Sequence, residues 1–87
     1  MSDEAFSPRE LLEYLAEGLV DDPEQVAVKE VAADDGGATV LELTVGPDDY
    51  GNVIGRGGRT ATALRTIIKA AASASGGGRV FVDIVDD

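Results

Sequence analysis

The chain has 87 residues, which is enough for one domain, and 44% of them are hydrophobic, so it can bury a core of modest size. It contains neither Cys nor His, which excludes disulfides and removes the soft ligands of most metal sites. No apolar stretch is long enough to span a membrane, and the first residues are acidic, unlike a secretory signal. We therefore expect a cytoplasmic protein with no metal, no cofactor and no membrane partner.

The first element in chain order is a helix over residues 8–20. Ser7-Pro8-Arg9-Glu10 has the pattern of a capping box with a proline at the first helical position. Phe6 before the cap and Leu11 within the first turns would form a hydrophobic staple. Leucines at helical spacing predict its buried face: Leu11, Leu12, Leu15 and Leu19.

Two strands follow, at residues 25–33 and 38–45. The first is rich in valine, and the second alternates so that Leu41, Leu43 and Val45 share one face. Between them Asp34-Asp35-Gly36-Gly37 has the composition of a hairpin turn.

The rest of the chain predicts a short helix from about residue 46 to 54, a long helix from about 59 to 75, and a last strand at 79–85. Ser75-Gly76-Gly77-Gly78 ends the long helix with residues that tolerate left-handed backbone. The long helix has one apolar stripe: Leu64, Ile67, Ile68, Ala71 and Ala72. The order αββααβ predicts one α+β domain, a two-layer sandwich with three helices on one face of a three-stranded sheet. We expect its core within residues 7–85 and flexible acidic termini at 1–6 and 86–87.

A glycine-rich loop, Gly55-Arg56-Gly57-Gly58, separates the short helix from the long one. Glycine permits positive φ and lets another backbone approach closely. The loop leads into the N-terminus of the long helix, where unpaired N–H groups favour an anion. With Arg56 and Arg59 beside it, the loop fits a clamp for a sugar-phosphate backbone. A tight helix–turn–helix, in which the glycines are purely structural, is the alternative.

The charges are unevenly distributed along the chain. The net charge is −10, whereas a nucleic-acid binder is expected to attract phosphate. Residues 51–82 nevertheless contain no acid, and the remainder carries all 17 acidic residues against two basic ones. The basic residues of this segment are Arg56, Arg59, Arg65, Lys69 and Arg79. The glycine loop therefore lies in the one basic segment of an acidic chain. The alternative explanation is that the long helix lacks acidic residues only because it faces a neighbouring element.

The run Val53-Ile54-Gly55-Arg56-Gly57-Gly58-Arg59 resembles the V-I-G-x-x-G signature of KH domains. From about residue 10 to 85 the chain is similar to the small bacterial single-domain KH proteins of the KhpA type. The resemblance implies a type II KH fold that binds about four nucleotides of single-stranded RNA.

By position, the resemblance assigns the clamp to Gly55, Arg56, Gly57 and Gly58, and a phosphate contact to Arg59. Val53 and Ile54 would either add apolar surface to the groove or pack in the core. Arg65 and Lys69 are further candidates for RNA contact, with a solvated helix face as their alternative role. Asn52, directly before this run, is also a candidate for RNA contact but stands where many relatives have a basic residue. The acidic turn at 34–37 would occupy the variable-loop position, and both features weaken the expected affinity.

The resemblance also implies an RNA chaperone or post-transcriptional regulator that acts as a homodimer or with a second KH protein of the KhpB (Jag) type. The acidic body favours one alternative, a KH-fold interaction module that docks on a ribosomal or regulatory partner with little RNA contact. An enzyme with a phosphate loop is disfavoured, because the loop lacks the Lys-Ser/Thr of a P-loop and the third glycine of a dinucleotide fingerprint. We thus expect neither catalysis nor a small-molecule substrate.

Overall fold

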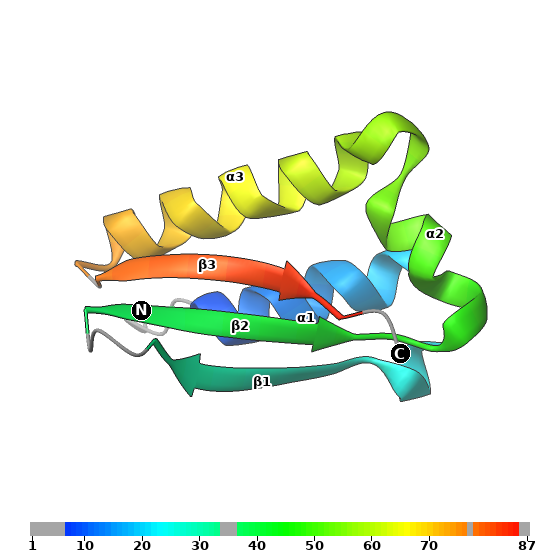
Figure 1. The fold of residues 1–87 in the computed structure, drawn as a ribbon, viewed down its shortest axis with the longest axis horizontal. Coiled ribbons are helices and arrows are strands. Elements are labelled where there is room, and N and C mark those ends of the chain that lie inside the picture. Colours follow the sequence, from blue (N-terminus) through cyan, green and yellow to red (C-terminus); the bar gives the residue numbers. More distant parts are fainter. Residues whose placement is uncertain (1–6, 34–36, 77, 86–87) are drawn as a thin grey trace, which may run out of the picture.

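The computed structural model describes residues 7–33, 37–76 and 78–85. The acidic termini, for which flexibility was predicted, and residues 34–36 of the predicted hairpin turn lie outside this part. Three α-helices and three strands follow one another in the predicted order αββααβ (Figure 1). The elements are α1 (Pro8–Leu19), η1 (Pro23–Gln25), β1 (Ala27–Ala32), β2 (Ala38–Thr44), η2 (Pro47–Asp49), α2 (Tyr50–Ile54), η3 (Arg56–Gly58), α3 (Arg59–Ala74) and β3 (Arg79–Ile84).

Local sequence signals account for several of these boundaries. The capping box at the start of α1 is confirmed, because the Glu10 N–H donates to Ser7 Oγ at 3.2 Å and the Ser7 N–H donates to Glu10 Oε1 at 3.1 Å. Phe6, the other half of the predicted staple, is not among the described residues. α3 ends at Ala74, and Gly76 follows with a φ of 76°.

The strands form one mixed sheet in the order β1-β2-β3. β1 and β2 are antiparallel neighbours, whereas β2 and β3 run parallel. A parallel pair needs a long crossover, and here the crossover consists of α2, the glycine loop and α3. Figure 1 shows α3 running alongside β3. β3 is an edge strand, because it comes last in the strand order of the described sheet.

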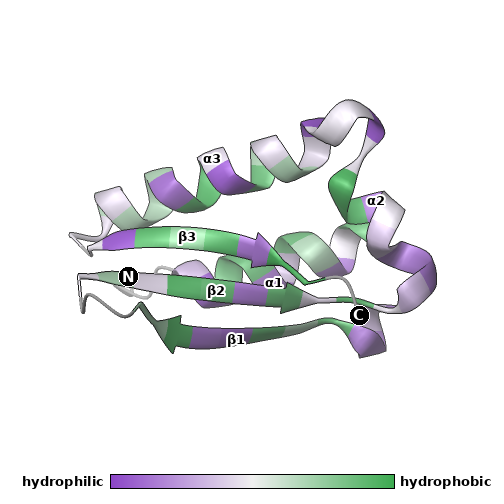
Figure 2. Ribbon diagram, in the orientation of Figure 1, coloured by the Kyte–Doolittle hydropathy of each residue, from purple (hydrophilic) through white to green (hydrophobic). Residues whose placement is uncertain are grey.

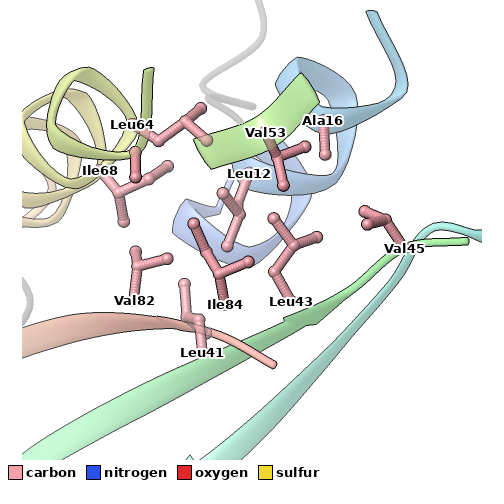
Figure 3. Close-up of a cluster of buried hydrophobic side chains, with 11 residues drawn as sticks. Leu12, Ala16, Leu41, Leu43, Val45, Val53, Leu64, Ile68, Val82 and Ile84 are labelled. Atoms are coloured by element: carbon pink, nitrogen blue, oxygen red, sulfur yellow. The ribbon is translucent and has the colours of Figure 1, made fainter. Parts of the chain in front are cut away.

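The core lies between the helices and one face of the sheet. Residues of β2 and β3 that point toward the helices are buried in it, and Figure 2 shows hydrophobic stretches on both strands. Its buried members come from all three helices and two strands (Figure 3): Leu12, Ala16, Leu41, Leu43, Val45, Val53, Ala61, Leu64, Ile68, Val82 and Ile84. The predicted α+β sandwich with its helices on one face is therefore confirmed.

Two residues predicted for the core are exposed instead. Leu19 is 38% exposed because it is the last residue of α1, and Ile67 is 43% exposed because it lies about 100° around α3 from Ile68. The small residues Ala16 and Ala61 are buried in their place. The exposed side chains, together with Tyr14, border a hollow of about 520 Å³ between α1 and α3. None of the helices in the described ranges is long and apolar enough to cross a membrane.

Candidate nucleic-acid interface

The glycine loop is a single 3₁₀ turn in which three glycines have left-handed φ values. Gly55, Gly57 and Gly58 have φ of 77°, 65° and 76°. The Gly58 N–H closes the turn on the Gly55 carbonyl at 3.1 Å. A Cβ at Gly55 would overlap the Thr60 side chain and lie 2.9 Å from the Thr60 nitrogen. The fold itself therefore requires a glycine at position 55. The alternative that the glycines are purely structural applies to this one position of the loop.

The other two glycines face open space. A Cβ on Gly57 or Gly58 would meet nothing within 4 Å, so their backbone is accessible to another chain. α3 begins directly after Gly58, and no side chain caps its N-terminus. The Arg59 N–H donates to the Arg56 carbonyl, and the positive end of the α3 dipole favours an anion here. Arg56 and Arg59 are both exposed beside it. This arrangement can hold a phosphodiester.

The residues before the loop anchor it. Val53 is fully buried in the core and Ile54 packs partly against it, so core packing is the role that the structure gives to Val53. Asn52 is exposed, and its side-chain amide donates to Asp49 Oδ1 at 2.8 Å. The packing of Val53 and the hydrogen bond of Asn52 hold the end of α2 in place, directly before the loop.

Asp49, the last residue of η2, is a buried carboxylate that was not among the candidate residues predicted from the sequence. It is 2% exposed and accepts the N–H groups of Asp21 at 2.9 Å and Asp22 at 3.0 Å, besides Asn52. The Asp21 N–H lowers the pKa of Asp49 most, burial opposes it, and Asn52 and the Asp22 N–H lower it further. This carboxylate ties the segment after α1 to α2. No local pattern points to it, because its backbone partners lie 27 and 28 residues earlier.

Away from the loop, side chains of α3 face the outer edge of β3, and we call this surface the α3–β3 groove. Arg65 Nε donates to the Val82 carbonyl at 3.4 Å, and Lys69 Nζ lies 5.8 Å from the centre of the Phe81 ring. Both cations are exposed but face β3 across the groove, so they are not simply a solvated helix face. At the end of α3 farther from the loop there is a cavity of about 550 Å³, lined by Lys69, Ala72, Ser73, Gly78, Arg79, Val80 and Phe81.

The β3 edge offers backbone hydrogen-bonding groups to this groove. The Val85 N–H donates inward to the Leu43 carbonyl at 2.9 Å, so alternate residues of β3 pair with β2. Val80 and Val82 consequently turn their N–H and carbonyl groups outward. The groove thus combines basic side chains with strand-edge donors and acceptors.

Most of the sequence-predicted residues lie in the glycine loop or on α3. Gly55 to Gly58 form the loop and Arg59 begins α3, while Arg65 and Lys69 lie further along α3 and face β3. The acidic turn predicted to oppose them lies mostly outside the described residues. Two groove residues, Arg79 and Phe81, were not candidates. Arg79 could have been identified from the basic character of its segment, and Phe81 from its position on the outer face of the last strand.

The family model for the KhpA/KhpB KH domain matches residues 9–84. RNA-binding protein KhpA of Clostridium acetobutylicum is 48% identical over 77 residues, which cover 88% of this chain and 99% of that protein. The Clostridium perfringens protein of the same name is 52% identical over 64 residues, 74% of this chain and 83% of its own length. RNA-binding protein KhpA of Streptomyces coelicolor is 51% identical over 77 residues, 88% of this chain and 90% of that protein.

Among solved structures, Aquifex aeolicus Era Y63A bound to GDP.AlF4- superposes with a TM-score of 0.60 at 18% identity. The match covers 99% of this chain but 34% of Era, so it supports the fold alone. The curated relatives are named as RNA-binding proteins. The match to their KH-domain family confirms the prediction that the chain is not an enzyme. From the family match over residues 9–84 and relatives about half identical over most of their length, the chain belongs to the KhpA/KhpB KH-domain family.

Proposed function

We propose that this chain binds single-stranded RNA, with the glycine loop holding the sugar-phosphate backbone and the α3–β3 groove receiving the bases. The observation that carries the proposal is the open backbone of Gly57 and Gly58 at the uncapped start of α3. Arg56 and Arg59 flank this backbone and supply charge for two phosphates. The names of the relatives support the same assignment.

A single strand fits this surface better than a duplex. Unpaired bases expose the edges that can meet the outward N–H and carbonyl groups of Val80 and the outward N–H of Val82, whereas paired bases do not. A KH loop of this kind clamps about four nucleotides, so the contact is small. With few phosphates neutralised and an acidic body around the groove, we expect micromolar binding.

The salt dependence of binding tests the proposal. Neutralising about three phosphates of a single strand predicts a slope of about −2 for the logarithm of the association constant against the logarithm of salt concentration. Fluorescence anisotropy with a labelled single-stranded octanucleotide measures it, and the same sequence annealed to its complement is the control. Absence of binding at low salt, or equal binding to the duplex, would show that the groove does not serve single strands.

We further propose that the protein acts in the cytoplasm as an RNA chaperone or post-transcriptional regulator, paired with a second KH domain of the KhpA/KhpB family. Two weak modules in one complex bind one RNA far better than either alone, through effective concentration. The apolar hollow between α1 and α3 supports such pairing, since Tyr14, Leu19 and Ile67 are the kind of side chains that an interface buries.

Sedimentation at tens of micromolar tests the pairing through the concentration dependence expected for a reversible dimer. We expect a dimer for the unmodified protein and a monomer for Ile67→Asp, which places a charge in the hollow. Thr66→Asp is the matched control, because the adjacent exposed Thr66 does not border the hollow. Monomers throughout, together with no KH protein co-purifying from cells, would refute the pairing.

A further inference from the structure

At the far end of the α3–β3 groove lies an aromatic ring that is not packed in the hydrophobic core. Phe81 is 40% exposed, whereas its neighbour Val82 is 8% exposed and packs in the core. Its strand position places it on the outer side of β3, and it lines the cavity with Lys69, Ala72 and Ser73 of α3. The ring therefore lies at the edge of the sheet, beside the groove.

Two cations from different elements lie within reach of this ring. Lys69 Nζ of α3 is 5.8 Å, and Arg79 Cζ of β3 is 5.5 Å, from the ring centre. Both distances are within the range of cation–π attraction. No acid is among the described residues that line the cavity, and Ala72 and Val80 give it apolar walls.

We propose that this end of the groove is a stacking site for one nucleobase, with Phe81 as its platform and Lys69 and Arg79 as contacts for the adjoining phosphates. The inference rests on the proposed RNA binding and extends it beyond the glycine loop. An aromatic face accepts any base, because every base has a π-face, so the site adds affinity with little sequence preference.

The charges on either side of the ring direct the strand along α3. On the outer face of the sheet, Glu42 and Asp83 are register partners next to the pair formed by Val40 and Phe81. These carboxylates repel phosphate, whereas the α3 side of the ring has Lys69 and, one turn earlier, Arg65. An RNA strand leaving the glycine loop is thus attracted into the groove and kept off the sheet face.

The length of α3 sets how much RNA is needed to reach the ring. Lys69 follows Gly58 by 11 residues, which is about 16 Å along the helix axis. Figure 1 shows α3 and β3 side by side over this stretch. At about 3.4 Å per stacked nucleotide, the ring lies about five nucleotides from the clamp. A tetranucleotide that leaves the loop with its bases stacked does not reach the ring, whereas an octanucleotide does.

Anisotropy titrations with a tetranucleotide and an octanucleotide of uniform sequence test the site on Phe81→Leu and Phe81→Tyr. We expect Phe81→Leu, which keeps the bulk but removes the ring, to weaken octanucleotide binding by about 5–20-fold and to leave tetranucleotide binding unchanged. Phe81→Tyr keeps the ring and should bind both RNAs as the unmodified protein does.

A second measurement needs no variant. The chain has only two phenylalanines, so the ring protons of Phe81 are readily assigned by NMR, and the octanucleotide but not the tetranucleotide should shift them upfield. Unshifted ring protons, or equal effects of Phe81→Leu on both RNAs, would overturn the stacking site while leaving the clamp in place. If the unmodified protein bound neither RNA, the proposed function would fail, and the inference with it.

Discussion

Replacing Arg56 and Gly57 together with aspartate should reduce affinity for single-stranded RNA by about 100-fold or more, since like charges forced together at an interface cost several kcal/mol. The two new carboxylates would face the phosphates that the loop is proposed to hold. The fold should remain, because Arg56 is exposed and a Cβ at position 57 meets nothing within 4 Å. Aspartate also tolerates the left-handed backbone of Gly57 better than most residues.

A matched control separates the clamp from net charge. Lys29→Asp combined with Ala27→Asp changes the charge by the same amount, at exposed positions on β1 outside the glycine loop, the groove and the hollow. Anisotropy titration should show a much smaller loss for this control, and circular dichroism should show folded protein for both variants. Equal losses would mean that only net charge matters. If the unmodified protein bound a protein partner but no RNA, the alternative of a protein-docking KH module would be favoured.

The fold was predictable because its signals are local. The capping pattern of Ser7 and Glu10, the alternation in residues 38–45 and the glycines after residue 74 each act within a few residues, and together they give αββααβ. Burial was less predictable. Ile67 and Ile68 look alike in sequence, yet only the rotation of α3 against the sheet decides which one is exposed.

The candidate site shows the same division. The loop could be identified from its glycines, but the sequence could not tell that Gly55 is required by the nearby Thr60 while Gly57 and Gly58 are open to solvent. Likewise, the basic segment was visible as a run of charges. That Lys69 lies over the Phe81 ring depends on how α3 packs beside β3, which is a property of the tertiary structure.

The role of Asp49 was the least predictable from the sequence. Its substitution by asparagine should lower the melting temperature by about 5–15 °C. Both carboxylate oxygens accept: Oδ1 from the Asp21 N–H and the Asn52 amide, Oδ2 from the Asp22 N–H. An asparagine has one acceptor oxygen, so its NH₂ group would face a partly buried N–H donor. Asp48→Asn, one residue earlier and exposed, removes the same charge and should change the melting temperature little.

The pH dependence of this difference gives the prediction its sharpest form. The pKa of Asp49 is lowered from its ordinary 3.8 in the folded protein, so the ionised carboxylate stabilises the fold fully above about pH 4. As pH falls through the lowered pKa, the carboxyl gains a proton and comes to resemble asparagine. Melting curves of the unmodified protein and Asp49→Asn should therefore differ most near neutral pH and converge in acid. A difference that stays constant from pH 7 to pH 2 would show that the charged acceptor is not what holds the segment after α1 against α2.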